Sequence, residues 1–271
     1  MKRNRHAQGH ALDSRDRYAG SYGPMNGAHN TTEKVKFMAL ADSTLNNTEI
    51  RELANSIRTS VPPIGDTVDV TALAVANEFS VRQFRTKPGI QSFIIVDDTA
   101  PIKGLPEGEI THRLIGYSLI SNSADRRGGI GHELGHFYLH KGNLPVIYDA
   151  CPSPGAAKYT DAKDETANDQ AELFARVLLI PAKEFSDRMK AELNMAGINE
   201  ADNGTNHTYI KTTKIFQSLG QRFVMTPRNI AQRVSDDDPE IKTLRLQYPF
   251  LKGIAETYVQ DVDSNRIDTN R

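Results

Sequence analysis

The sequence has a single cysteine, Cys151, and no apolar stretch that approaches the roughly 18 residues needed to cross a bilayer. The lone cysteine excludes an internal disulfide framework and fits a reducing cytoplasm. A formal net charge of -1 excludes a polybasic nucleic-acid binder. No apolar segment follows the basic start, MKRNRHAQGH, so we expect no secretory signal. These absences favour a soluble cytoplasmic protein that does not enter a membrane.

The composition of the 271 residues predicts three parts. Residues 1–45 are polar and largely without helical or strand period, which predicts a flexible tail. Residues 46–235 carry most of the regular apolar patterns and are expected to form one folded domain. Residues 236–271 keep one apolar patch, from Leu244 to Leu251, and are expected to pack as a C-terminal appendage.

The apolar periods predict an α+β fold in which a small antiparallel sheet of about three strands packs on a mostly helical domain. Asn46 and Asp69 are expected to cap two early helices. The second is predicted to bury Ala72, Val75, Ala76 and Phe79. The expected strands are 81–86, 91–97 and 109–121. Further helices are expected at about 129–142, 182–195, 212–219 and 227–234. A long helix is also expected before Pro181, which ends it.

The strongest chemical signal is the run His132-Glu133-Leu134-Gly135-His136. On a helix, residues four apart lie on the same side, so both imidazoles can face one ion. Neutral imidazole suits Zn²⁺, and Glu133 can reach a water bound to it and act as general base. His140 lies about 6 Å of helical rise beyond His136 and is expected to pack or to face solvent instead.

A third metal ligand is expected from the long helix that ends before Pro181. Glu165, Asn168 and Glu172 are three and four residues apart and therefore share one face of that helix. A solvated charged surface is the alternative interpretation of this face.

Three segments in this order resemble the ImmA/IrrE-type metallopeptidases: GHELGHFYLH, QAELFARVLLIP and LGQRFVMTPRNIAQRV. The upstream DTVDVTALAVANEFSV and FIIVDD look like the entry region of the same family, so the resemblance spans about residues 65–235. It implies a gluzincin-like fold, a Zn²⁺ site (Mn²⁺ is the alternative metal) and cleavage of a DNA-binding repressor, which would switch on phage, mobile-element or stress genes.

One position departs from the family pattern E-x-x-A-N/D-x-F-A-x-x-L-L-x-P, whose first Glu is a metal ligand. Asn168 stands at that position, and Glu172 stands where the pattern has a residue that supports a ligand histidine. An amide is a poor Zn²⁺ ligand. Three outcomes follow: Glu172 is the ligand, Glu165 is the ligand, or the site is a weak two-histidine site. We favour Glu172.

Other candidates carry less weight. His207, Tyr209 and Tyr117 are possible donors to the oxyanion of the transition state. Residues 215–234 also fit a helix–turn–helix, but only Arg228 and Arg233 are basic in the second helix, so direct nucleic-acid binding is not expected.

The sequence therefore predicts a cytoplasmic zinc endopeptidase with His132, His136 and Glu172 as metal ligands and Glu133 as catalytic base. Its expected partner is a protein substrate, a helix–turn–helix repressor. The alternative, favoured by Asn168, is a pseudo-peptidase that binds its partner as a regulator or sensor without cutting it.

Overall fold

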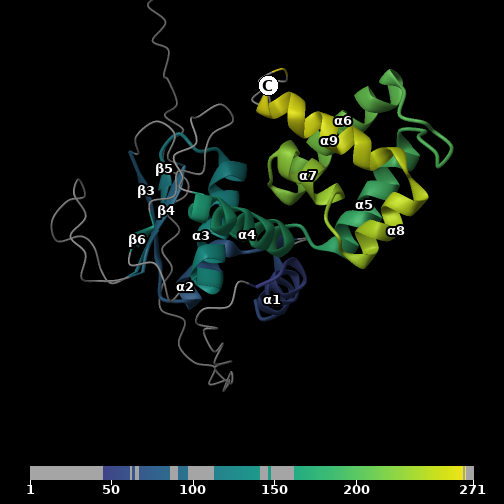
Figure 1. The fold of residues 1–271 in the computed structure, drawn as a ribbon. Coiled ribbons are helices and arrows are strands. Elements are labelled where there is room, and N and C mark those ends of the chain that lie inside the picture. The colour runs from purple at the N-terminus through teal and green to yellow at the C-terminus, as the bar shows by residue number, and fades with distance from the viewer. Residues whose placement is uncertain are drawn as a thin grey trace, which may run out of the picture. The chain divides into compact units, whose positions relative to one another are not determined.

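The computed structural model describes residues 45–61, 63–64, 67–85, 91–96, 113–140, 146–147, 162–264 and 266 (Figure 1). These residues all lie in one compact unit, residues 39–271. The tail expected for residues 1–45 lies outside the described residues except for Leu45, and Cys151 lies outside them as well.

The helices of the described part are as follows: α1 (Asn47–Thr59), α2 (Val70–Ala76), α3 (Ser123–His140), α4 (Ala162–Leu179), α5 (Ala182–Met195), α6 (Asn206–Phe223), α7 (Pro227–Val234), α8 (Pro239–Gln247) and α9 (Phe250–Asp263). The strands are β1 (Pro63–Ile64), β2 (Thr67–Val68), β3 (Ser80–Phe84), β4 (Ser92–Ile95), β5 (Leu114–Ser118) and β6 (Val146–Ile147). None of the described helices is long and apolar enough to cross a membrane.

The predicted α+β class is confirmed, but the sheet is mixed rather than wholly antiparallel. Its strand order is β3-β5-β4-β6, and β5 pairs in parallel with β3 and antiparallel with β4. Burial accounts for the order of the strands, but not for the parallel pairing. All four residues of β4 and four of the five in β5 are buried, so these strands take central positions, whereas the half-exposed β3 lies at an edge. The two-residue strand β6 was not predicted.

Local signals account for several helix boundaries. The side chain of Asn46 accepts from the backbone N–H of Glu49, whose carboxylate accepts from the N–H of Asn46, and this capping box starts α1. Thr226 caps α7, with Pro227 as its first residue, as predicted. Helix α6 is longer than predicted, because Thr205 caps it and the helix begins among polar residues that resemble a loop.

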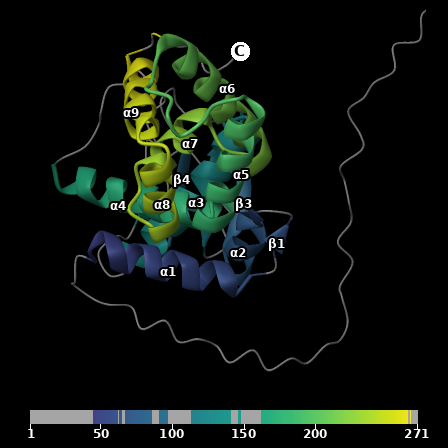
Figure 2. The same cartoon turned by 90° about the vertical axis from the view of Figure 1, so that its right-hand side faces the viewer.

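Helix α3 lies between the sheet and α4, and α1 and α7 also pack on α4 (Figures 1 and 2). Two glycines permit the close approach of α3 and α4. A Cβ on Gly135 would lie 2.8 Å from the carbonyl oxygen of Ala171, and a Cβ on Gly131 would lie 2.9 Å from Leu179 Cδ1 and 3.5 Å from Ala175 Cβ. Because the contact moves toward the C-terminus of α4 as it moves toward the N-terminus of α3, the two helices run antiparallel.

Candidate metal centre

The two histidines of the H-E-x-x-H run lie on the buried face of α3. His132 and His136 are 7% and 2% exposed, and their Nε2 atoms are 3.1 Å apart. A tetrahedral Zn²⁺ with Zn–N bonds of about 2.0–2.1 Å holds two imidazole nitrogens roughly 3.3–3.4 Å apart. The spacing of the two nitrogens is therefore close to that of two ligands of one metal ion.

Glu133 is fully buried on the neighbouring side of α3, toward the sheet. Ser92, on β4, is also fully buried, and its Oγ donates a 2.7 Å hydrogen bond to Glu133 Oε1. A Cβ on Gly129 would lie 3.0 Å from this hydroxyl, so the glycine leaves room for Ser92. Sequence analysis missed Ser92, because it is 41 residues from Glu133 and no local pattern marks it.

His140 binds the side of His136 that faces away from His132. The Nδ1 atoms of His136 and His140 are 3.1 Å apart, and His140 Nε2 is 3.0 Å from Gln170 Oε1 on α4. Gln170 in turn donates from Nε2 to the carbonyl of Leu45, at 3.0 Å. His140 is half-buried and packs against His136, one of the two outcomes expected for it, but its bonds to His136 and Gln170 were not predicted.

Glu172 lies on α4 among cations. Its Oε1 accepts from Arg228 Nη1 at 3.2 Å and lies 3.7 Å from Arg176 Nη1, and the side chain is 37% exposed. Desolvation raises the pKa of Glu172, but Arg176, Arg228 and His132 outweigh it and hold the pKa below its ordinary value. Glu172 is therefore a charged carboxylate near His132 that two arginines also bind.

The other residues considered for the third ligand occupy the same helix. Asn168 is half-buried on α4, and the side chain of Glu165 lies outside the described residues. Within the described ranges, no group of three or more His, Cys, Asp or Glu side chains is arranged to hold a metal ion. The described donors thus consist of the two neighbouring imidazoles, and Glu172, which arginine engages, is not arranged with them as a third ligand in this structure.

The candidate oxyanion donors occupy different environments. Tyr209 lies in α6 and not in a loop, and its hydroxyl donates to Asp261 on α9 at 3.0 Å. Desolvation and Asp261 raise the pKa of Tyr209 to about 12. His207 is exposed on α6, and the ring of Tyr117 on β5 lies under the guanidinium of Arg126, 5.6 Å away.

The two arginines of the possible helix–turn–helix are bound within the protein. Arg233 is fully buried, donates to Asp236 and Asp238, and reaches the carbonyl of Ile180. Arg228 binds Asp263 through Nε at 2.8 Å, in addition to Glu172. In this arrangement α7 belongs to the scaffold around α4.

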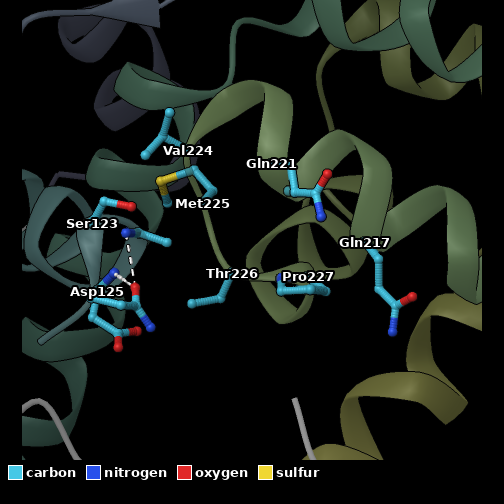
Figure 3. Close-up of a pocket in the computed structure, with 11 residues that line it drawn as sticks. Ser123, Asp125, Gln217, Gln221, Val224, Met225, Thr226 and Pro227 are labelled. Carbon is cyan, nitrogen blue, oxygen red and sulfur yellow. Dashed lines mark hydrogen bonds between the residues drawn. The ribbon is translucent and has the colours of Figure 1, made fainter. Parts of the chain in front are cut away.

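A separate pocket of about 440 Å³ lies between the start of α3 and the junction of α6 with α7 (Figure 3). Asn122 caps α3 there by accepting from the backbone N–H groups of Ala124 and Asp125. Val224 ends α6 in the left-handed region, at φ 50°, which is strained for a β-branched residue. None of the candidate metal ligands lines this pocket.

Residues 95–226 match the family model of the IrrE N-terminal-like domain. This segment belongs to the ImmA/IrrE metallopeptidase family. The match includes α3 and α4 and ends at the residue that caps α7. A search of curated proteins finds no match to the chain. Membership in a peptidase family indicates a hydrolase whose substrates are proteins, and the family is one of zinc enzymes.

Proposed function

We propose that this protein is a zinc-dependent endopeptidase that hydrolyses a peptide bond in a protein partner. The observation that carries the proposal is the pair of buried imidazole nitrogens, 3.1 Å apart, beside the fully buried carboxylate of Glu133. Zinc binds the neutral form of imidazole. Because both rings lie on a buried helix face, few water molecules compete with them for the ion. The family of residues 95–226 supports the same chemistry.

The residues divide the work as follows. His132 and His136 would hold the ion through Nε2, and a bound ion would supply a water molecule of lowered pKa and polarise the substrate carbonyl. Glu133 accepts a proton from the attacking water and delivers it to the leaving amine. The hydroxyl of Ser92, bonded to Glu133 Oε1, restricts the rotation of the carboxylate.

The third ligand in this proposal is Glu172. Gly135 lies against Ala171, and Gly131 lies near Ala175, so Glu172 falls at the level of the turn between His132 and His136. Asn168 lies one turn before Glu172 in α4 and Glu165 about two turns before it, which is roughly 6 and 10 Å of helical rise.

Substitution of Glu172 tests this assignment. Glu172→Ala should release zinc, whereas Asn168→Ala and Glu165→Ala should retain it, as measured by metal analysis after dialysis. Loss of zinc from Glu165→Ala alone would move the ligand to Glu165. If only Asn168→Glu retained zinc, Glu172 would not be a ligand and the chain would lack its third one.

The substrate we propose is a helix–turn–helix repressor in the cytoplasm, which follows from the family resemblance. Glu133→Gln should keep about one zinc ion per chain and lose cleavage, because it removes the base and spares the imidazoles. His136→Ala is the control that should lose both. The assay is co-expression with a candidate helix–turn–helix repressor, followed by gel analysis. Cleavage by Glu133→Gln at the parent's rate would contradict the mechanism.

A second function is a regulator that keeps the peptidase scaffold and binds its partner without cutting it. Two observations favour it: an amide stands at position 168, and Glu172 is bound by Arg228 and Arg176. A purified parent protein without zinc, which still binds the repressor in a pull-down, would support this function over the peptidase.

A further inference from the structure

A line of hydrogen bonds extends from His136 to the start of α1, on the side away from His132. It runs from His136 Nδ1 to His140 Nδ1, from His140 Nε2 to Gln170 Oε1, and from Gln170 Nε2 to the carbonyl of Leu45, with distances of 3.1, 3.0 and 3.0 Å. Its members come from α3, α4 and the residue before the cap of α1. The proposed hydrolysis uses neither His140, nor Gln170, nor the carbonyl of Leu45.

Chemistry fixes the direction of every bond in this line. A backbone carbonyl only accepts, so the NH₂ group of Gln170 faces Leu45 and its Oε1 faces His140. An amide oxygen also only accepts, so His140 Nε2 must carry a hydrogen. In neutral His140 the other nitrogen, Nδ1, is then an acceptor. The Nδ1 of His136 must therefore be the donor at the next bond.

The end of the line is the nitrogen that would bind metal. A neutral imidazole with its hydrogen on Nδ1 carries its lone pair on Nε2. In His136 this Nε2 is the atom that lies 3.1 Å from Nε2 of His132. We propose that the Leu45 carbonyl, Gln170 and His140 set the tautomer and ring orientation of His136, which makes Gln170 and His140 positioning residues for the metal centre.

The arrangement differs from ordinary packing in two respects. Gln170 satisfies both ends of its amide at once, and it joins segments that are 125 residues apart, Leu45 and α4. Tyr138, on the same helix α3, also bonds a distant segment, since Asn77 Nδ2 donates to its hydroxyl at 2.7 Å, but no imidazole takes part in that bond. Tyr138→Phe is therefore a matched control for a lost hydrogen bond to α3.

The first experiment measures the tautomer in metal-free full-length protein. Long-range ¹H–¹⁵N correlation spectra of the imidazoles, recorded at about pH 8, should show His136 protonated at Nδ1 and His140 at Nε2. In Gln170→Leu the signals of His136 should move toward a mixture of tautomers. Tyr138→Phe should leave them unchanged. Protonation of His136 at Nε2 in the parent protein would overturn the inference.

The second experiment measures zinc affinity by competition with a chromophoric chelator. Gln170→Leu and His140→Phe should each weaken binding by roughly 10- to 100-fold, the range found when a partner behind a ligand histidine is lost. Tyr138→Phe should keep the affinity of the parent. Equal affinity of Gln170→Leu and the parent would overturn the inference. The inference rests on the proposed metal site. The tautomer measurement nevertheless tests the inference by itself, because it needs no zinc and can succeed even if the proposed function fails.

Discussion

The two helices that form the candidate metal centre hold their polar side chains in different ways. His136 and His140 on α3 bond to each other, and Gln170 on α4 extends this line behind them. On α4, the carboxylate of Glu172 is bound by two cations, Arg176 and Arg228. The imidazole side is thus oriented before a metal arrives, whereas the carboxylate side is bound by groups that compete with a metal.

The cations of α4 also belong to a network that reaches the last helices. Arg176 forms two hydrogen bonds of 3.0 Å with Asp236, which shares Arg233 with Asp238. Arg228 binds Asp263 at the end of α9. In the proposed site α3 supplies the imidazoles, whereas the charged groups of α4 mainly join the network that links α4 to the last helices.

Removal of Arg233 tests the stabilising half of this comparison and has the largest expected effect. Arg233→Met would leave Asp236 and Asp238, each 5% exposed, without their shared cation. The loss of one partner from a buried ion pair costs about 3–5 kcal/mol when the remaining charge is left unpaired. Because Arg176 still binds Asp236 and Arg51 lies 3.5 Å from Asp238, we expect a smaller decrease of about 2–3 kcal/mol in the free energy of unfolding, measured with urea.

A matched control for this substitution is Lys183→Met, which removes an exposed ion pair with Asp187 within α5 and should leave stability nearly unchanged. If Arg233→Met were as stable as this control, the buried network would not hold α7 and α8 in place. Zinc binding by Arg233→Met under conditions where it is folded should persist, since the imidazole line contains none of these groups.

Acid tests the same network with a smaller effect, because protonation removes a charge but keeps the side chain. Desolvation raises the pKa of Asp236, but Arg176 and Arg233 outweigh it and lower the pKa below its ordinary value. The ion pairs therefore stabilise the fold fully above the unfolded-state pKa of about 3.9, and this contribution is lost as the pH falls through the lower folded-state value. The free energy of unfolding should be steady near pH 7 and fall below about pH 4. In Asp236→Asn the decrease should be shallower, and an equal slope would show that other carboxyl groups cause it.

Features set by neighbouring residues could be predicted from the sequence. The cap of α1 at Asn46, the start of α7 at Pro227 and the two histidines on one face of α3 all depend on spacings of four residues or fewer. Such patterns are visible without knowledge of the fold, because the partner of each group is already in the local chain.

Features set by distant residues could not be predicted. In the short helix α2 the sequence predicted a buried face with Val75, but Val75 is 60% exposed and Leu73 and Ala74 are buried instead. Both faces fit a helical period, and contacts with distant segments decide between them. Of the predicted face only Phe79, which follows the helix, is buried, and it packs on Phe137. Ser92 and Gln170 were missed for the same reason, since their partners are far away along the chain.

Removal of Arg228 tests whether this arginine competes with zinc for Glu172, and it has the smallest expected effect of these substitutions. In Arg228→Met the carboxylate would lose the cation 3.2 Å away, while Arg176 remains 3.7 Å away. Because Glu172 is 37% exposed, we expect competition worth only about 1 kcal/mol, or a gain of roughly three- to tenfold in zinc affinity by chelator competition. Asp263→Asn is the control, since it loosens Arg228 from α9 and keeps the charge beside Glu172. Weaker zinc binding in Arg228→Met would show that the arginine orients the carboxylate rather than competing for it, and unchanged affinity would remove Glu172 from the ligand set.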